Sequence, residues 1–310
     1  MRKALIAIFI FLGAVAYGQQ DPQFSHYMFA VPFYNPAYAG LSGDISVNLL
    51  NHNQWLKFEG APRTNLLTVD APIDVLGKTF GIGAKILSDQ YAFIQDLSFG
   101  LLMAYQIDVG LGKLSVGLSA SAFSKQFKDV NWNFPDRPEQ LFDNQSRSMV
   151  MDFDLGVFYI YNNLFAGFSV THITAPNFVF ISQGGSQAQV GLVRHYYLTA
   201  GYNITSANSL FDITPSFLVK SDARSIQFDV NLSVLYNKKF WTGVSYRNGE
   251  SIVGFVGTSY FKDIRIGLSY DALINTINRV SNGTFEVYLG YNFSLLRMEK
   301  PQHYHNVKTL

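Results

Sequence analysis

The 310-residue sequence contains no cysteine. This absence excludes a disulfide framework, a thiolate metal site and a thiol nucleophile, so packing and backbone pairing must stabilise the chain. Charged residues are also few, at 15%, whereas soluble domains have roughly 25%. The 23 Lys and Arg residues nearly balance the 22 Asp and Glu residues. The sequence therefore gives no electrostatic reason to expect nucleic acid as a partner.

Long hydrophobic runs are missing as well. Beyond residue 18, no stretch of roughly eighteen consecutive apolar residues occurs, so no transmembrane helix is expected there. Yet aromatic residues make up 15% of the chain, and glycine occurs 25 times. These features together indicate that apolar side chains alternate with small or polar ones. Such a composition is typical of a membrane β-barrel.

Residues 1–18 have the layout of a secretory signal peptide. Arg2 and Lys3 form a basic start, residues 4–15 are apolar, and Ala16-Tyr17-Gly18 is a small-x-small cleavage site. We expect this segment to be cleaved after directing the chain across the inner membrane; a retained anchor is the alternative. The remaining sequence divides into an N-terminal arm or plug (19–43), a barrel (44–295) and a C-terminal periplasmic tail (296–310).

Apolar residues recur at every second position through most of the chain. The clearest example is Leu97, Phe99, Leu101, Met103, Tyr105 and Ile107. The same period occurs in residues 80–86, 114–120, 226–236, 264–271 and 285–295. Between Ile45 and Leu295 we count about fourteen such segments, each close to the length of a tilted membrane strand; twelve or sixteen strands remain open. The pattern predicts an all-β, transmembrane antiparallel β-barrel, and a soluble β-sandwich is the alternative.

The connections between these segments distinguish the two folds. If the arm starts in the periplasm, long connections are expected at 51–63, 88–95, 124–148 and 172–193, all on the outer side. Short ones are expected at 72–78, 108–113 and 162–163 on the periplasmic side. Outer-membrane barrels sort their connections in this way, and a sandwich has no reason to. The alternation therefore favours the membrane barrel.

The arm is rich in aromatic residues and carries prolines at positions 22, 32 and 36. These prolines suit an extended path outside a β-ladder, and the aromatic side chains would be a costly apolar display in water. We expect the arm to lie inside the barrel or across its periplasmic mouth.

Polar residues on the inward parity predict a polar, water-filled lumen: Asp229, Asn231, Arg247 and Asp271. A three-residue turn at 237–239 would place Asp229 directly opposite Arg247. No Ser lies in a Gly-x-Ser-x-Gly turn, and His303-x-His305 lacks a third ligand. We therefore expect no catalytic residue, no cofactor and no metal.

Aromatic residues occur in two of the expected outer loops, where polar residues would be usual: Trp132, Phe134, Phe142, Phe178 and Phe180. Such residues dominate the energetics of protein interfaces. We interpret them as partner contacts; the alternative is that these loops fold over the lumen.

The arm and the first loop closely resemble the start of the PorP/SprF family. The matching arm residues are Asp21, Pro22, Tyr27, Met28, Asn35, Pro36, Tyr38 and Gly40. The matching loop residues are Gln54, Trp55, Phe58, Gly60 and Pro62. Further likeness in 227–231, 240–247 and 267–271 extends the resemblance over essentially the whole mature chain.

The resemblance implies an outer-membrane, non-enzymatic component of the type IX secretion and gliding machinery. Its implied partners are a secreted adhesin with a type IX C-terminal domain, other type IX outer-membrane or periplasmic components, and outer-membrane lipid. It would help the adhesin to cross the membrane or to stay attached at the cell surface. The alternative is an outer-membrane channel for small hydrophobic or polar solutes, which the polar residues expected in the lumen disfavour for hydrophobic ligands.

Overall fold

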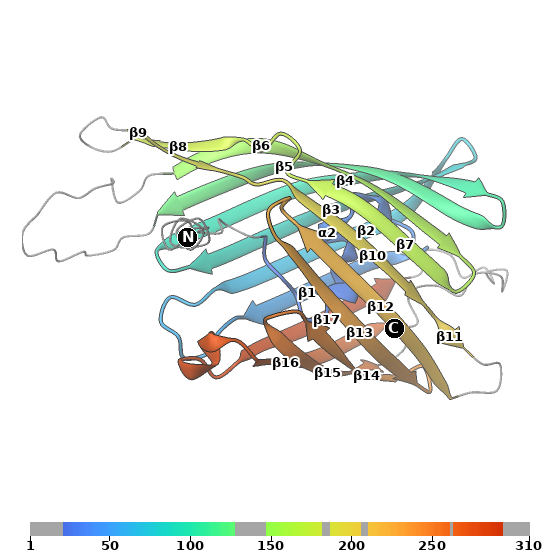
Figure 1. The fold of residues 1–310 in the computed structure, drawn as a ribbon. Helices are drawn as coiled ribbons and strands as arrows, with labels where there is room; N and C mark the ends of the chain where they lie inside the picture. The colour runs from blue at the N-terminus through green and yellow to red at the C-terminus, as the bar shows by residue number, and fades with distance from the viewer. Residues whose placement is uncertain (1–20, 128–146, 182–186, 206–209, 261–262, 294–310) are drawn as a thin grey trace, which may run out of the picture.

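The computed structural model describes residues 21–127, 147–181, 187–205, 210–260 and 263–293. The expected signal peptide (1–18) and tail (296–310) lie outside these ranges. Within them, no helix is long and apolar enough to cross a bilayer. The predicted fold is confirmed, because the chain forms a closed antiparallel β-barrel of fourteen strands (Figure 1).

The strands of the wall follow one another around the barrel in sequence order. They are β1 (Ile45–Asn53), β2 (Arg63–Val75), β3 (Lys78–Tyr91), β4 (Ile94–Val109), β5 (Gly112–Phe127), β6 (Arg147–Tyr161), β7 (Leu164–Thr171), β10 (His195–Tyr202), β12 (Phe211–Ser221), β13 (Ile226–Tyr236), β14 (Phe240–Arg247), β15 (Ser251–Tyr260), β16 (Ile264–Leu273) and β17 (Thr284–Phe293). The short β11 (Ile204–Thr205) continues the pairing of β10 with β12. β8 (Asn177–Ile181) and β9 (Gln187–Gly191) form a separate hairpin.

The barrel has no free sheet edge, because β1 pairs with β17 and β10 pairs with both β7 and β12. Closure is what allows a sheet to span a membrane, since lipid offers no partner for backbone groups. The alternation seen in the sequence sets the two faces. On β13, Phe228, Val230 and Leu232 are exposed on the outer surface, whereas Asp229 and Asn231 are buried inside.

The two ends of the barrel differ in their connections. Long loops at one end include 54–62, 172–194 with the β8–β9 hairpin, and 274–283 with the 3-10 helix η3 (Thr276–Arg279). We call this end outer and the other end periplasmic, as in membrane barrels generally. The expectation of a long loop at 88–95 is wrong, because β3 continues to Tyr91 and β4 begins at Ile94. Alternating side chains and pairing persist there, so only a tight turn is left.

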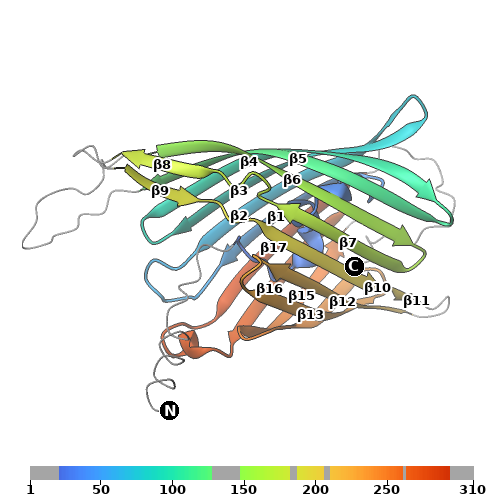
Figure 2. The ribbon, with the colours of Figure 1, turned by 45° about the horizontal axis from the view of Figure 1, so that its top comes forward.

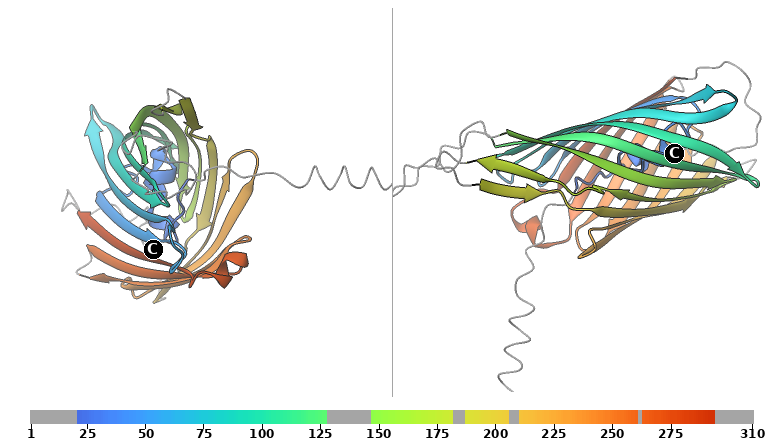
Figure 3. Two further views of the ribbon diagram at one scale, coloured as in Figure 1. Left: turned by 90° about the vertical axis from the view of Figure 1, so that its left-hand side faces the viewer. Right: turned by 90° about the horizontal axis from the view of Figure 1, so that it is seen from above.

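The arm fills the lumen. It contains η1 (Tyr27–Phe29), α2 (Val31–Tyr34) and η2 (Pro36–Tyr38), drawn in blue inside the ring of strands (Figures 2 and 3). Asp21 contacts His172 and His195, which lie where β7 ends and β10 begins at the outer end. Gly40 lies against Gly81 near the periplasmic turn between β2 and β3. The arm therefore crosses the whole lumen, which is the first of the two positions expected from the sequence, inside the barrel and not merely across its periplasmic mouth.

The lumen is not polar throughout. Phe24, Tyr27, Phe29 and Tyr34 of the arm form one buried cluster with apolar side chains of the wall: Leu50, Leu66, Leu87, Tyr197, Leu235, Trp241, Val253, Phe255 and Tyr288. The rings of Phe29 and Tyr288 stack with centroids 4.2 Å apart. The sequence predicted a water-filled interior and did not reveal this apolar cluster. Inward-facing apolar residues of the wall pack against the arm, and the path of the arm is not evident from the sequence.

The register between β13 and β14 is the one expected from the sequence. Asp229 pairs with Arg247, and Tyr236 pairs with Phe240. The outward neighbours Val230 and Tyr246 are therefore directly opposite each other. Because the chain has no cysteine, a disulfide can form only between residues introduced for that purpose.

We predict that the double variant Val230→Cys/Tyr246→Cys crosslinks readily under copper-phenanthroline oxidation of the folded barrel. Directly opposed residues have Cβ atoms about 4.5–5.5 Å apart, within disulfide reach. The control pair Val230→Cys/Val244→Cys lies on the same face but two positions out of register, at roughly 7–8 Å. Faster crosslinking of the control pair, read as a mobility shift on gels, would contradict the register.

Candidate functional site

The motif Asn35-Pro-Ala-Tyr-Ala-Gly40 lies on a row of small residues in the wall. Gly81, Ala104, Gly117 and Gly156 are direct neighbours on four consecutive strands, β3 to β6. A Cβ on Gly117 would be 2.3 Å from the Ala37 backbone nitrogen, which real Cβ contacts do not allow. The row therefore leaves space for this part of the arm backbone to touch the sheet.

Hydrogen bonds hold both ends of this motif. The Asn35 amide donates to the carbonyl oxygens of Val157 and Phe168, at 3.0 and 3.3 Å, and its side-chain oxygen accepts from the Ala37 N–H. At the other end, the Gly40 N–H donates to Asp70 at 2.9 Å. These contacts explain why an Asn and a Gly with a positive φ of 69° are needed at the two ends.

A second set of polar contacts between the wall and the arm involves Glu286 of β17, which is completely buried. We call each such set of contacts a grip, and the hydrogen bonds of the Asn35–Gly40 motif are the first. Its carboxylate accepts hydrogen bonds from the backbone N–H groups of Ser25 and His26, at 2.9 and 2.8 Å. The Nδ1 atoms of His26 and His52 each lie 2.8 Å from the same carboxylate. One carboxylate thus fixes two consecutive arm residues to the wall.

Arg247 forms the third grip. Its guanidinium donates to Asp229 at 3.0 Å, to Asp271 at 3.1 Å and to the carbonyl oxygen of Phe24 at 3.4 Å. Asp271 in turn accepts from the Ser25 hydroxyl at 2.6 Å. The pair between Asp229 and Arg247 thus exists as the sequence register requires, and it connects to the arm.

The remaining residues highlighted by the sequence also lie in the lumen or at its mouth. Asn231 donates to Ser245 at 2.6 Å. The Tyr27 hydroxyl lies 2.8 Å from that of Ser216. Met28 packs against the central cluster, and the Tyr38 ring meets Phe158 edge-on with ring centroids 5.2 Å apart. Pro36 lies over Gly117. Pro22 lines a space at the outer mouth.

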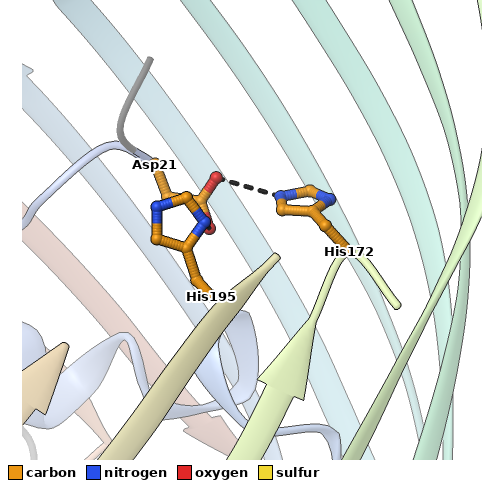
Figure 4. Close-up of side chains that lie close together, drawn as sticks. All are labelled: Asp21, His172 and His195. Atoms are coloured by element: carbon orange, nitrogen blue, oxygen red, sulfur yellow. Dashed lines mark hydrogen bonds and ion pairs between the residues drawn. The ribbon is translucent and has the colours of Figure 1, made fainter. Parts of the chain in front are cut away.

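Asp21 attaches the start of the arm to the outer end of the wall, and we call its contacts there the latch. Its carboxylate lies 2.9 Å from His172 Nε2, accepts from the Tyr197 hydroxyl at 2.9 Å and is 3.6 Å from His195 Nδ1. Lys220 donates to the Asp21 carbonyl oxygen at 2.5 Å. Figure 4 shows Asp21 beside both imidazole rings, which come from neighbouring strand ends.

Two groups of ligand-type side chains meet here, Asp21 with His172 and His195, and Asp152 and Asp154 with His172. However, the second nitrogen of His172, Nδ1, lies 2.7 Å from Asp152. Both ring nitrogens face carboxylates, so the ring donates twice and is a charged imidazolium. The arrangement fits an ion-pair latch better than a metal site, because a metal needs a free nitrogen lone pair.

The charges of the latch depend on one another. Burial disfavours ionisation of Asp21, but His172 and His195 outweigh burial and hold the pKa of this carboxyl well below its usual range. Burial likewise lowers the pKa of His172, but the carboxylates of Asp21 and Asp152 raise it to about 10. Asp21 and His172 are therefore both charged at neutral pH, whereas burial lowers the pKa of His195.

Above the latch lies an outer vestibule of about 740 Å³. Asp21, Pro22 and Gln23 contribute its floor, and Trp55, Asp89, Lys125, His195 and Glu250 are among its walls. Two of the spaces that the arm leaves below the floor have volumes of about 10 Å³ each. In the described part of the chain, the lumen is closed beneath the vestibule.

The loop that carries the family motif forms part of the vestibule rim. Gln54, Trp55, Gly60 and Pro62 line the vestibule, whereas Phe58 is exposed and packs edge-on against Trp55. The loop is held by neighbouring tips, since Leu56 exchanges backbone hydrogen bonds with residues 282 and 283 and the Ala92 N–H donates to Gly60. Trp55 and Lys57 have positive φ angles of 51° and 69°, which is strained for such residues.

The residues interpreted as partner contacts divide into two groups. Trp132, Phe134 and Phe142 lie outside the described residues. Phe178 and Phe180 are each only 2% exposed, and Phe180 packs on Phe127 with ring centroids 4.7 Å apart. These two rings therefore face inward, as in the alternative reading, because β8 alternates and presents Val179 and Ile181 outward instead.

Sequence reasoning missed Glu286, His172, His26 and Lys85 as arm-holding residues. Glu286 lies on the inward parity of β17, between the outward Phe285 and Val287, and this lone carboxylate on the strand was a usable signal. His172 lies just past a strand, and nothing in the sequence indicates that two carboxylates converge on it.

Comparison with known proteins identifies one family. The family model described as type IX secretion system membrane protein PorP/SprF matches residues 16–291. No curated protein sequence matches the chain significantly.

Solved outer-membrane channels share the fold. The CymD monoaromatic hydrocarbon channel is 13% identical, with a TM-score of 0.51 over 91% of this chain and 96% of that one. The toluene transporter TbuX of Ralstonia pickettii is 11% identical, with a TM-score of 0.51 over 85% of this chain and 93% of that one. At such identities the likeness shows the barrel architecture alone. With the family match, it places the chain in the outer membrane.

We predict that Gly117→Ala destabilises the seated arm by about 1–3 kcal/mol, the usual cost of overpacking. The added methyl group would collide with backbone atoms of Pro36 and Ala37. Gly254→Ala is the matched control, because a Cβ there meets nothing within 4 Å. Urea unfolding in detergent, together with limited proteolysis of the arm, measures the difference, and equal behaviour of both variants would argue against the small-residue row as the arm's seat.

We predict that His172→Gln lowers the free energy of unfolding by about 3 kcal/mol at neutral pH, since it leaves buried carboxylates unpaired. The parent should lose this contribution as pH rises through about 10, because a raised pKa stabilises the fold below the unfolded value and is lost above the folded one. Below pH 4 the contribution of Asp21 should fade as well, because its depressed pKa acts in the opposite sense. The parent-minus-variant difference as a function of pH is the measurement, and a difference that does not change near pH 10 would rule out the latch.

Proposed function

This chain belongs to the PorP/SprF family of type IX secretion system membrane proteins, and we propose from this membership that it is a dedicated partner of a secreted adhesin. In this role it retains, or helps to deliver, a large protein with a type IX C-terminal domain at the cell surface. The barrel serves as a fixed platform in the outer membrane, and its outer loops carry the contacts. Other type IX components in the outer membrane or periplasm complete the assembly.

The observation that carries this proposal is the seated arm. Its family-motif residues, from Asp21 to Gly40, contact the wall from one end of the lumen to the other. Among the described residues, the seated arm blocks passage of a client or solute through the lumen. Its outer surface and its lipid-facing belt are what it offers to partners.

The channel alternative has weaker support. The two structural relatives are described as a hydrocarbon channel and a toluene transporter, but their low identity transfers no ligand to this chain. A channel would require the arm to leave, breaking the grips of Glu286 and Arg247 together. A non-enzymatic platform also agrees with the described lumen below the vestibule, where polar side chains hold the arm.

We predict that replacing residues 128–146 with a short Gly-Ser linker abolishes retention of the client while the barrel still folds. This loop contains Trp132, Phe134 and Phe142, aromatic residues of the kind that anchor interfaces. Affinity purification from solubilised outer membrane should recover one large secreted protein with the parent and lose it with the variant.

The control is Leu76→Gln, at a periplasmic turn where the side chain is 97% exposed. This variant should retain the client, and all three proteins should show heat-modifiable migration on gels. Unchanged recovery with the loop variant would reject the assignment of this loop. Recovery of no secreted protein with the parent would reject the platform function.

A further inference from the structure

The outer vestibule has more acidic than basic side chains. Asp21, Asp89, Asp96 and Glu250 line it, with Lys125 as the one Lys or Arg among its lining residues. Asp96 is paired with Lys125 at 2.5 Å, and Asp21 is held in the latch described above. The excess negative charge therefore resides at Asp89 and Glu250.

Neither of these carboxylates has a cationic partner to itself in the described part of the chain. Asp89 accepts from the Thr64 hydroxyl at 2.7 Å and forms no ion pair there. Glu250 is 3.7 Å from Arg247, but that guanidinium also serves Asp229 and Asp271. Because the single charge of Arg247 is shared among three carboxylates, net negative charge remains, and it attracts a positively charged group.

Unpaired hydrogen-bonding atoms lie on the same walls. Four lining residues carry a buried polar atom without a partner among the described residues: Gln23 Oε1, Trp55 Nε1, Asp96 Oδ1 and His195 Nε2. His195, with a side chain only 2% exposed, donates from Nδ1 to the Val193 carbonyl at 2.8 Å, so its Nε2 is an acceptor. Three of these atoms are acceptors and one is a donor. Guanidinium and ammonium groups, which only donate, fit this set.

Aromatic side chains complete the vestibule. Trp55, Tyr91, Phe123 and Phe178 line it. The Lys125 ammonium already lies 5.5 Å from the ring centroids of Tyr91 and Phe178 while it pairs with Asp96. The chain itself thus shows how a cation is held in this space, between rings and a carboxylate.

We propose that the vestibule is a socket for a polypeptide segment that presents an arginine or lysine side chain. A volume of about 740 Å³ accepts several residues, and the closed floor makes the segment stop there and not pass through. A saccharide would also supply donors, but it brings no positive charge to Asp89 and Glu250. The inference deepens the proposed function and rests on it, since it assigns a basic segment of the partner to this place.

The test uses the full-length protein in detergent at low salt and two fluorescent, end-capped peptides. One is Gly-Gly-Arg-Gly-Gly, and the other carries citrulline, an uncharged analogue of arginine, in the central position. Fluorescence anisotropy should show binding of the arginine peptide and at least tenfold weaker binding of the citrulline peptide, roughly what one or two partly exposed ion pairs provide. Absence of binding, or equal binding of both peptides, overturns the proposal.

Variants locate the binding. Asp89→Asn/Glu250→Gln removes two vestibule carboxylates with little change of shape and should weaken the arginine peptide about tenfold. The matched control Asp74→Asn/Asp263→Asn removes two exposed carboxylates at the periplasmic end and should leave binding unchanged. Heat-modifiable migration verifies that each variant is folded. Equal weakening by both double variants means that only net charge matters, and the socket is then rejected.

Two further outcomes separate this inference from the proposed function. Displacement of the arginine peptide by maltoheptaose would identify a saccharide site and overturn the assignment to a polypeptide. If the peptide binds as expected but no secreted protein co-purifies with the parent, the platform function fails while the socket stands. If the variant Asp89→Asn/Glu250→Gln retains the client as the parent does, and the arginine peptide does not bind, the socket alone is rejected.

Discussion

The structure depends on satisfying the backbone of an irregular segment inside a closed barrel. A buried N–H or carbonyl group without a partner is costly, and the arm has no strand beside it to provide one. Side chains of the wall take that role at intervals along its path. Glu286 accepts from two arm N–H groups, Lys85 donates to the Phe33 carbonyl oxygen at 3.2 Å, and Ser169 donates to that of Tyr34 at 2.7 Å. These polar residues of the lumen are therefore partners of the arm and not the lining of a water-filled pore.

This constraint also explains how charge is distributed in the lumen. Lys85 and Arg247, two cations that hold the arm, are themselves buried, and each has a carboxylate partner in the wall. Lys85 pairs with Asp154 at 2.8 Å while it holds the arm, and Arg247 pairs with Asp229 and Asp271. Apolar packing at the centre supplies contact area, and these polar grips determine the position of the arm along the barrel axis.

The sequence predicted the structure correctly wherever the alternation of every second residue alone determines the orientation and pairing of a strand. Alternation along β13 and β14 set both the membrane-facing side and the pairing of Asp229 with Arg247, because a shift by one residue would turn every side chain to the wrong face. Contacts between residues that are far apart in the sequence could not be predicted from it. The row from Gly81 to Gly156 and the meeting of Asp21, His172 and Asp152 join positions on separate strands and the arm. The inward orientation of Phe178 and Phe180 could not be decided from the sequence, because loop aromatic residues look alike whether they cover a lumen or contact a partner.

The arm and the vestibule form one thermodynamic unit. Asp21, Pro22 and Gln23 belong both to the plug and to the vestibule floor, so the vestibule exists in this form only while the arm is seated. Any group that binds there must stabilise the seated arm by its own binding free energy, and the seated arm must strengthen that binding equally. A partner engaged at the outer surface would thus keep the lumen closed. Secure attachment outside and a sealed membrane then follow from the same set of contacts.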